Sequence, residues 1–496
     1  MSRFTSSALA TWTGGRWTTT PVPPLAGFAI DTRQLRPGEV FVALKTGKRD
    51  GHDFLAAAKA AGAAAALVAR ADAAVPLPQL VVADPLAALQ AIARAHRREF
   101  RGPVIGITGS AGKTSTKELL ALLLGGPEAG VLATEGNLNN HLGVPLTLTR
   151  LDPARHRYAV IEAGISAPGE MAPLAAMIEP DVALNTLVAA AHTEALGSLD
   201  GVAREKAQLP AAVRPAGVAI FPRQSAEFGA FRALGVRTLI VERADVIRPE
   251  EPAKDRVYFT VTHRADTTAI ALAYGRPPPL VFTMRRVSDG MAQNAVLAVC
   301  AALWLGVTAA DIGRRLAQWQ PAKLRGEVRH EAGRLVYLDC YNANPAAMAD
   351  ALGVFQAMAP AAVPRLYVIG SMEELGAEAA ASHRALGRSL ALRPEDRLFV
   401  TGTHAHEVCA GVLETGDYSC HADRDVARSR GRLLRRLAGR RLHQGQPPLP
   451  IGKHRRTRRR LRPCLAISPI TSISSARCAC CGISPCARCW ARAPRW

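Results

Sequence analysis

The sequence lacks any apolar run long enough to cross a membrane. A spanning helix needs about 20 consecutive apolar residues, and the alanine-rich segment at residues 60–68 is much shorter. The first residues also lack the basic start and apolar stretch that are typical of a signal peptide. We therefore expect a cytoplasmic protein with no membrane partner, and 496 residues give room for about three domains.

Cysteine is sparse in most of the chain, and acidic residues are absent from its last part. Only four of the ten cysteines precede residue 426, which is typical of a reducing compartment in which thiols stay free. Residues 426–496 hold 17 arginines, one lysine and no acidic residue, so the net charge of +21 falls to +3 for the first 425 residues. The body of the chain therefore has an ordinary charge, and we expect no nucleic-acid partner for it.

A strand, a glycine-rich loop and a helix are predicted in succession at residues 104–124. The run VIGIT is apolar, GSAGKT supplies two glycines and a lysine, and ELLALLL has a helical pattern. In such a loop the backbone N–H groups and the helix N-terminus bind phosphate oxygens. Lys113 is predicted to contact the β- and γ-phosphates, and Thr114 to bind Mg²⁺ through its hydroxyl. Ile107 replaces the first glycine of the strict pattern, but the flanking strand and helix argue against a chance match.

Polar residues follow several of the other predicted strands. Glu162 ends the apolar strand at 158–162, where an open α/β sheet binds its ligands, so we predict that it binds Mg²⁺. The loop GNLNN at 136–140 offers amides to polar groups, although a turn-rich connector fits the same residues. His192 follows the strand at 182–186, and Lys206 lies on a helical stretch 14 residues later. Without further evidence, a lone histidine is more often structural and a helix lysine is more often solvated.

Several separated blocks of the chain resemble the MurF-type Mur ligases, the UDP-N-acetylmuramoyl-tripeptide–D-alanyl-D-alanine ligases. The similarity follows the family's order over about residues 28–425. The last block, with residues 370–376 behind it, indicates the MurF branch, because the tripeptide-forming relatives would show Asn-Pro-Arg. The blocks are DTR at 31–33, PG at 37–38, DGH at 50–52, TGSAGKTS at 108–115, GNLNN at 136–140, Glu162, AH at 191–192 with Lys206, Arg325, and YNANP at 341–345.

The resemblance implies an α/β fold with the three-domain Mur ligase architecture. Residues 1–85 would form the N-terminal domain that binds the UDP-substrate, residues 86–316 a central P-loop ATPase domain, and residues 317–427 a C-terminal Rossmann-like domain. The alternating strand and helix patterns up to about residue 306 separately predict a mostly parallel sheet. In the third domain the pattern predicts a hairpin at 327–338 and strands at 366–370 and 397–401. The family's closing strand and helix are absent from the expected place, so this domain is predicted to be incomplete.

The family's reaction is ATP-dependent amide formation in cytoplasmic peptidoglycan precursor synthesis. The carboxylate of UDP-MurNAc-tripeptide takes the γ-phosphoryl group of ATP, and the amine of D-Ala-D-Ala attacks the acyl phosphate. The resemblance implies two Mg²⁺ ions, one held by Thr114 and Glu162 and a second by His192 and Lys206. Carbamylation of Lys206 by CO₂ would turn a cation into a carboxylate-like ligand. Lys113, Glu162, His192 and Lys206 are the implied catalytic residues of a monomeric enzyme.

The resemblance also implies two groups of binding residues. Of the family's Gly-x-His-Asn-x-x-Asn helix start, here SDGMAQN at 288–294, only the last asparagine is kept. The implied contacts of the nucleotide and its phosphates are Thr108, Gly109, Ser110, Ala111, Gly112, Lys113, Thr114, Ser115, Asn294, Arg325, Asp339, Tyr341, Asn342 and Asn344. The implied contacts of the UDP-substrate are Thr32, Arg33, Asn137, Asn139 and Asn140.

Residues 428–496 depart most from the family. The runs RSRGR and RRTRRR, with CACCGISPCARC at 478–489, fit a nucleic-acid-binding arm with a cysteine metal site. The same acid-free composition fits out-of-frame translation of GC-rich DNA, and we interpret the segment as a frameshift product. Two alternatives to an active ligase remain open: a P-loop protein that binds nucleic acid through this segment, and an inactive ligase relic with an exposed third-domain core.

Overall fold

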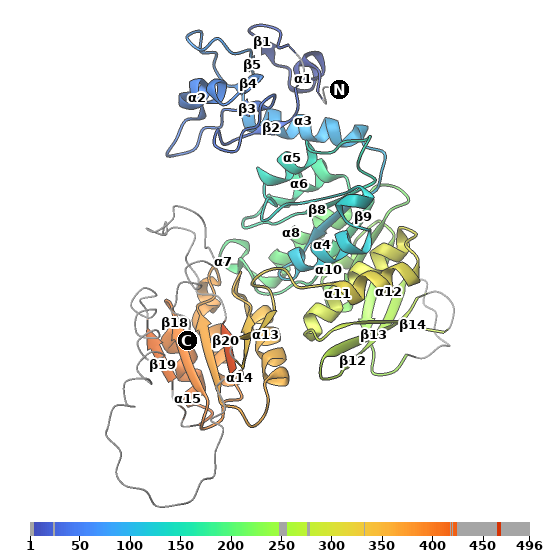
Figure 1. The fold of residues 1–496 in the computed structure, drawn as a ribbon, viewed down its shortest axis with the longest axis vertical. Coiled ribbons are helices and arrows are strands. Elements are labelled where there is room, and N and C mark those ends of the chain that lie inside the picture. The colour runs from blue at the N-terminus through green and yellow to red at the C-terminus, as the bar shows by residue number, and fades with distance from the viewer. Residues whose placement is uncertain are drawn as a thin grey trace, which may run out of the picture. The chain divides into compact units, whose positions relative to one another are not determined.

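A computed structural model shows a mixed α/β chain (Figure 1). It describes residues 4–22, 25–247, 255–274, 278–331, 333–416, 418, 420–423 and 464–467, with the backbone alone at 421, 423 and 464–467. The contacts within the chain divide it into two units. Unit 1 comprises residues 1–188, 195–286 and 291–319, and unit 2 comprises residues 189–194, 287–290 and 320–496.

Unit 1 begins with a five-stranded sheet in the order β1-β5-β4-β3-β2, in which only β1 is antiparallel to its neighbour. Alternating apolar side chains of this sheet pack against the long helix α3, so both belong to one core. The elements are α1 (Ser6–Thr13), β1 (Arg16–Trp17), β2 (Phe28–Ala29), β3 (Val40–Val42), η1 (Gly51–Phe54), α2 (Leu55–Ala60), β4 (Ala65–Val68), β5 (Gln79–Val81) and α3 (Pro85–Glu99).

The helix α3 leads into the central sheet and is well defined at its start. Asp84 accepts hydrogen bonds from the N–H groups of Leu86 and Ala87, and Pro85 occupies the first helical position, where its missing N–H costs nothing. The buried Arg97 near the helix end donates to the carbonyl of Ile178 at 2.8 Å. This hydrogen bond joins α3 to the last residue of the helix α6 (Met171–Ile178).

The central sheet has nine strands in the order β14-β13-β12-β11-β10-β9-β6-β8-β7 (Figure 1). Neighbouring strands are parallel from β7 to β12, which confirms the predicted mostly parallel sheet, and only the pairs β12–β13 and β13–β14 are antiparallel. The strands are β6 (Val104–Thr108), β7 (Val131–Ala133), β8 (Tyr158–Glu162), β9 (Val182–Asn185), β10 (Val218–Pro222), β11 (Thr238–Arg243), β12 (Arg256–His263), β13 (Thr267–Ala273) and β14 (Leu280–Arg285).

The strand β6 lies near the middle of this sheet, between β8 and β9, and all five of its residues are buried. Its carboxyl end therefore lies beside the ends of two other parallel strands, the usual place for a ligand. The helices of this part are α4 (Lys113–Leu123), η2 (Pro127–Ala129), α5 (Gly143–Leu148), α6 (Met171–Ile178), α7 (Thr193–Leu196), α8 (Leu199–Ala211), α9 (Arg223–Ala226), α10 (Gly229–Arg232), α11 (Asp289–Trp304) and α12 (Ala309–Gln318).

Unit 2 is built on a six-stranded sheet in the order β15-β16-β20-β17-β18-β19. The hairpin β15–β16 and the strands β17 and β18 lie where the sequence predicted them. The elements are β15 (Glu327–Glu331), β16 (Arg334–Leu338), α13 (Pro345–Met358), β17 (Arg365–Gly370), η3 (Gly376–Glu378), α14 (Ala379–Ser389), β18 (Arg397–Thr401), α15 (Ala405–Leu413), β19 (Cys420–Asp423) and β20 (Cys464–Ile467).

The strand β20 was not anticipated from the sequence, which placed the end of this domain at residue 427. All four of its residues pair in parallel with β17, and three of them also pair in parallel with β16, so the sheet continues across them. The arginine runs and the cysteine cluster of the same segment lie outside the described residues. The proposed nucleic-acid arm and cysteine metal site therefore remain interpretations of the sequence.

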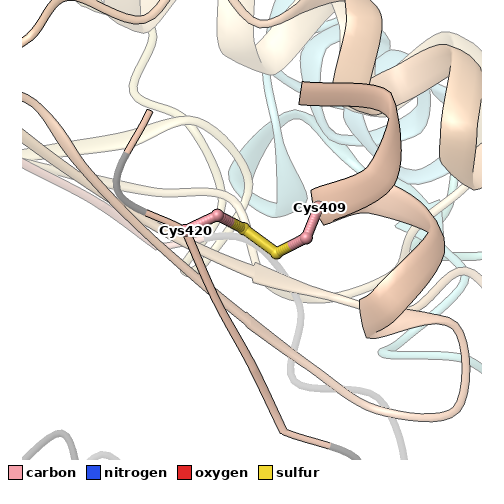
Figure 2. Close-up of a disulfide and its surroundings, with 2 residues drawn as sticks. All are labelled: Cys409 and Cys420. Atoms are coloured by element: carbon pink, nitrogen blue, oxygen red, sulfur yellow. A yellow bond between two sulfur atoms is a disulfide. The ribbon is translucent and has the colours of Figure 1, made fainter. Parts of the chain in front are cut away.

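A disulfide joins α15 to β19, between Cys409 and Cys420, whose Cα atoms lie 5.9 Å apart (Figure 2). This corrects the expectation that all body cysteines are free. The two residues are 11 positions apart in the sequence, and the return of the chain from α15 to the neighbouring strand brings them together. Cys300 and Cys340 are free.

Within the described part of the chain, no helix has the length and apolar character that spanning a membrane requires.

Candidate functional site

The loop between β6 and α4 has the geometry of a phosphate-binding loop. Gly112 immediately precedes α4 with a φ of 79°, so the helix N-terminus opens directly from the glycine turn. The Nζ atom of Lys113 donates to the carbonyl of Gly109 at 2.8 Å. Ser110 is buried in the loop, and its N–H donates to the carbonyl of Leu187 at 2.9 Å. The N-terminus of α4 can therefore meet an anion at this end of the sheet.

Two loop positions have no room for a side chain. A Cβ atom on Gly109, where φ is 143°, would lie 1.8 Å from the Oγ1 atom of Thr186. A Cβ atom on Gly112 would lie 2.4 Å from the Nδ2 atom of Asn294. Thr186 and Asn294 therefore require glycine at these positions. The Oδ1 atom of Asn294 is buried without a hydrogen-bond partner, so this amide has an unused acceptor beside the loop.

The predicted magnesium ligands Thr114 and Glu162 lie together. The Thr114 hydroxyl donates to Oε2 of Glu162 at 2.9 Å, which places a hydroxyl and a carboxylate at the ends of neighbouring elements. Asn139 donates through Nδ2 to the other oxygen, Oε1, at 2.8 Å. Oxygen ligands of this kind are those that Mg²⁺ prefers. The donor set therefore fits a magnesium ion, and Asn139 orients the carboxylate.

The backbone of Glu162 is also fixed, by residues that the sequence did not indicate. Its N–H donates to the hydroxyl of Thr134 at 3.0 Å. The buried Lys117 donates to the carbonyl of Thr134 at 2.6 Å and pairs with Glu118. Lys117 therefore links α4 to the ends of β7 and β8 and holds the carboxylate position.

Lys206 is fully buried on α8, whereas the sequence alone favoured a solvated helix-face lysine. Burial lowers its pKa well below the ordinary value, and the charge of Lys113 lowers it further, while Glu205 acts in the opposite sense. The packing of α8 against β9, β10 and β6 explains why its inward face is covered. An uncharged amine beside the P-loop lysine is the form of lysine that reacts with CO₂.

His192 belongs to unit 2, whereas Thr114, Glu162 and Lys206 belong to unit 1. Its Nδ1 atom forms an ion pair with a carboxylate oxygen of Glu374. His192 and Glu374 both adopt left-handed backbone conformations, with φ values of 57° and 61°. Among the residues whose positions are described, no three His, Cys, Asp or Glu side chains cluster as metal ligands. The second metal site, with His192 and Lys206, therefore remains a prediction.

Three predicted nucleotide contacts meet in unit 2. The guanidinium of Arg325 lies 3.8 Å from the centre of the Tyr341 ring, and the N–H of Cys340 donates to the carbonyl of Leu324 at 3.0 Å, which holds their two segments together. Asp339 directly precedes Cys340 and is partly buried, and desolvation raises its pKa to about 7. Arg325 opposes that rise, and the charge of Asp350 adds to it. The stacked cation and half-exposed ring offer a flat surface to an aromatic base.

Two other predicted nucleotide contacts have local structural partners. Asn344 precedes α13 and caps it, since its side chain accepts a hydrogen bond from the N–H of Ala347 at 2.9 Å. Asn342 is exposed and accepts from the N–H of Ala343 at 2.9 Å. The buried Asn344 therefore has a helix-capping role, which the sequence analysis did not assign to it.

The predicted substrate residues divide between a loop after β2 and the loop before α5. Arg33 is exposed and forms paired hydrogen bonds with Asp31, at 2.9 Å from Nε and 2.6 Å from Nη2. This pairing lowers the pKa of Asp31. Asn140 accepts from the N–H groups of Leu142 and Gly143, so it closes the turn before α5. Thr32 is half-buried, and Asn137 is exposed.

Thr186 is the main residue of the P-loop region that the sequence analysis missed. Its hydroxyl donates to the carbonyl of Ala111, and its N–H donates to the carbonyl of Thr108 at 2.9 Å. The signal was available, because Thr186 is a polar residue directly after a buried strand that neighbours β6. Thr108 and Ser115 keep their predicted places at the start of the loop and in the first turn of α4.

Known proteins resemble this chain along most of its length. Residues 24–97 match the family described as "Mur ligase family, catalytic domain", residues 107–302 match "Mur ligase middle domain", and residues 324–436 match "Mur ligase, glutamate ligase domain". The UDP-N-acetylmuramoyl-tripeptide–D-alanyl-D-alanine ligase of Escherichia coli is 34% identical over 396 residues, which cover 79% of this chain and 84% of that one.

Two further relatives agree with this match. The ligase of the same name from Bacillus subtilis is 31% identical over 400 residues, 78% of this chain and 82% of the relative. The crystal structure of MurF from Acinetobacter baumannii superposes with a TM-score of 0.78 at 30% identity, covering 94% of this chain and 95% of that one. Sequence and structure therefore agree on one family.

Proposed function

The chain belongs to the Mur ligase family, and on that premise we propose that it joins D-Ala-D-Ala to UDP-MurNAc-tripeptide in an ATP-dependent reaction. The relatives that match it over more than two thirds of their length carry the name of this activity. The observation that carries the proposal is the hydroxyl–carboxylate pair of Thr114 and Glu162 beside the P-loop lysine. This arrangement suits phosphoryl transfer from a bound nucleotide.

The reaction proceeds in two steps. An oxygen of the terminal tripeptide carboxylate bonds to the γ-phosphorus as the bond to the β-phosphate oxygen breaks, which yields ADP and an acyl phosphate. The amine of D-Ala-D-Ala then bonds to the acyl carbon, phosphate leaves, and the amine loses a proton. Lys113 stabilises negative charge on the transferring group, and the loop N–H groups hold the phosphates.

Thr114 and Glu162 would hold Mg²⁺, which neutralises charge on the phosphates when it is bound. Asn139 orients Glu162 through its second carboxylate oxygen, so the ligand is positioned before the metal arrives. We propose a second magnesium site with His192 and carbamylated Lys206. The buried amine of Lys206, whose pKa is lowered, supports the carbamylation because CO₂ combines only with the uncharged form.

For the nucleotide base and ribose, we propose contacts with Asn294 in unit 1 and with Arg325, Asp339, Tyr341 and Asn342 in unit 2. Thr32, Arg33, Asn137, Asn139 and Asn140 are proposed to contact the UDP-substrate. We propose that the enzyme works as a monomer in the cytoplasm. Residues 428–496 are proposed to be an out-of-frame product, and resequencing of the gene tests this: the idea fails if no single-base insertion or deletion restores the family's Lys-Gly-Ser-Arg ending.

Phosphate release measured with purified full-length chain tests the proposed activity. We expect release to require ATP, UDP-MurNAc-tripeptide and D-Ala-D-Ala together, and mass spectrometry to detect the pentapeptide product. Lys113→Ala, which removes the charge that stabilises the transferring group, is the negative control. A chain with the family's ending restored is the second comparison. Absence of product with both the full-length chain and the restored chain would contradict the proposal.

A further inference from the structure

His383 is a fully buried histidine in unit 2 for which the proposed reaction has no use. It lies on α14, and no part of its side chain is exposed. The N–H of Met372 donates to its Nε2 atom at 2.8 Å. Since Nε2 is an acceptor, the proton is on Nδ1, which donates to the carbonyl of Ala379 at 2.6 Å. The neutral imidazole therefore joins the start of α14 to the loop that follows β17.

This loop, residues 371–376, contacts the segment that carries His192. The Thr193 hydroxyl donates to the carbonyl of Leu375 at 3.3 Å. A Cβ atom on Gly376 would lie 3.1 Å from Cα of Glu194, so the two backbones pass close to one another. Glu374 forms the ion pair with His192 described above. All of these residues belong to unit 2, and the loop therefore determines where the His192 side chain points.

His404, which follows the end of β18, makes a second set of contacts with the same loop and with His383. The N–H of His404 donates to Oγ of Ser371 at 3.1 Å. The His404 ring stacks on the His383 ring, with centres 4.7 Å apart. Met372 itself is buried, so loss of its acceptor would leave a buried N–H without a partner. The His383 imidazole is therefore one of the contacts that hold this loop, and it is the one that pairs the buried Met372 N–H.

We propose that His383 is a positioning residue, which acts through the loop 371–376 to hold Glu374 and thereby His192 in a single orientation. Its side chain is fully buried among protein groups, so we place its action on the loop and not on a ligand. The kinetic part of this inference rests on the proposed ligase function, whereas the structural part does not. Neither the resemblance nor the matched families assign a role to this residue.

The neutral form of His383 is required, because a protonated ring has no acceptor for the Met372 N–H. Burial lowers the pKa of His383, and His404 lowers it further. The bond to Ala379 and the carboxylates of Glu373 and Glu407 act in the opposite sense. The ring is therefore neutral near pH 7, and acid releases the loop.

Two substitutions test the hydrogen-bond acceptor at Nε2 of His383 separately from the rest of the ring. The amide oxygen of Gln in His383→Gln reaches the Nε2 position and can accept from Met372. The shorter Asn in His383→Asn reaches only the Nδ1 position, so it can bond Ala379 but not Met372. Asp396→Asn is the control for general destabilisation of unit 2. Buried Asp396 accepts a hydrogen bond from the N–H of Arg365. This bond lies where β17 and β18 begin, at the ends of these strands away from the loop 371–376.

Hydrogen–deuterium exchange of the Met372 amide is measured first, since it needs no activity. We expect exchange in His383→Asn to be about tenfold faster than in the parent chain, with protection kept in His383→Gln and Asp396→Asn. In the parent chain, the protection of the Met372 amide should fall as the pH is lowered, after correction for the pH dependence of intrinsic amide exchange. In His383→Gln the corrected protection should not change with pH. Equal protection in the parent chain and His383→Asn would overturn the proposal.

Steady-state kinetics then test the link to His192. We expect kcat to fall about tenfold in His383→Asn and to be restored in His383→Gln. The KM for ATP should stay unchanged, because neither the P-loop nor the proposed nucleotide contacts of unit 2 belong to the loop 371–376. Equal kcat in the Asn variant and the parent chain, or an equal loss in Asp396→Asn, would overturn the proposal. If neither the parent chain nor the chain with the family's ending restored makes product, the ligase proposal fails, and exchange alone decides the role of His383.

Discussion

Lys206 shows how a residue's chemistry depends on its burial. A solvated lysine stays charged and does not combine with CO₂, whereas the buried Lys206 has a lowered pKa. We expect ¹³C-bicarbonate to give a carbamate carbon signal in the NMR spectrum of the parent chain and no such signal in Lys206→Arg, because arginine stays charged. The exposed Lys59, on α2, gives the matched control Lys59→Arg, which should keep the signal. A spectrum of Lys206→Arg identical to that of the parent chain would contradict the assignment.

Asn139 acts on the metal through Glu162. Removal of its amide in Asn139→Ala leaves the carboxylate free to rotate, so we expect the half-saturating Mg²⁺ concentration for phosphate release to rise about tenfold. Asn137→Ala is the control, since Asn137 is exposed in the same loop and makes no side-chain contact with Glu162 in the described structure. The same Mg²⁺ dependence in both variants would show that Asn139 does not orient the ligand.

Asp339 predicts a pH dependence of unit 2. Its pKa of about 7 exceeds the ordinary value of 3.8, so the folded chain binds this proton more tightly than the unfolded chain does. The contribution of Asp339 to the free energy of unfolding is therefore largest below pH 4 and is lost as the pH rises towards 7. We expect this slope to disappear in Asp339→Asn. Asp350→Asn should lower the pKa of Asp339, measured by ¹³C NMR, and an unchanged pKa would contradict the coupling.

At the scale of elements, Asn344 has a capping role that can be measured. We expect Asn344→Ala to lower the free energy of unfolding of unit 2 by about 1 kcal/mol, because the first turn of α13 loses its acceptor. Asn344→Asp should restore most of it, since aspartate caps equally well. The exposed Asn342→Ala should have little effect. Equal denaturant midpoints for Asn344→Ala and Asn342→Ala would refute the capping role.

The sequence was a good guide to elements whose residues carry a local signal. The strands β6, β8 and β17 each contain a run of consecutive apolar residues, and β15–β16 has a glycine turn, so their places could be predicted. Asn344 could not be assigned from its type alone, because an asparagine before a proline suits a ligand and a helix cap equally. The burial of Lys206 depends on which face of α8 packs against the sheet, and that is decided by strands far away in sequence.

At the scale of the whole molecule, β20 connects the two halves of the unit 2 sheet. A chain ending at residue 427 would lack it and leave the facing edges of β16 and β17 unpaired. We expect its unit 2 to melt several degrees lower than in the full chain, as followed by differential scanning calorimetry. A chain ending at residue 475 keeps β20 and is the matched control. Equal melting of the two truncated chains would show that β20 adds no stability.

The pairing of β20 illustrates the limit of sequence reasoning at this scale. Its residues, CLAI, are too few to stand out in an arginine-rich segment, and their position depends on two strands more than 90 residues earlier. The disulfide between Cys409 and Cys420 is similar, since a spacing of 11 residues has no meaning until α15 returns the chain to the sheet. Family membership, by contrast, followed from short motifs in a fixed order, which long-range packing does not obscure.

The transfer of oxygen from substrate to phosphate tests the central claim most directly. UDP-MurNAc-tripeptide labelled with ¹⁸O in its terminal carboxylate is incubated with the chain, ATP and D-Ala-D-Ala, and the released phosphate is analysed by mass spectrometry. If the carboxylate is activated as an acyl phosphate, each phosphate carries one oxygen atom from that carboxylate. Phosphate that carries only oxygen from water and ATP would contradict the account.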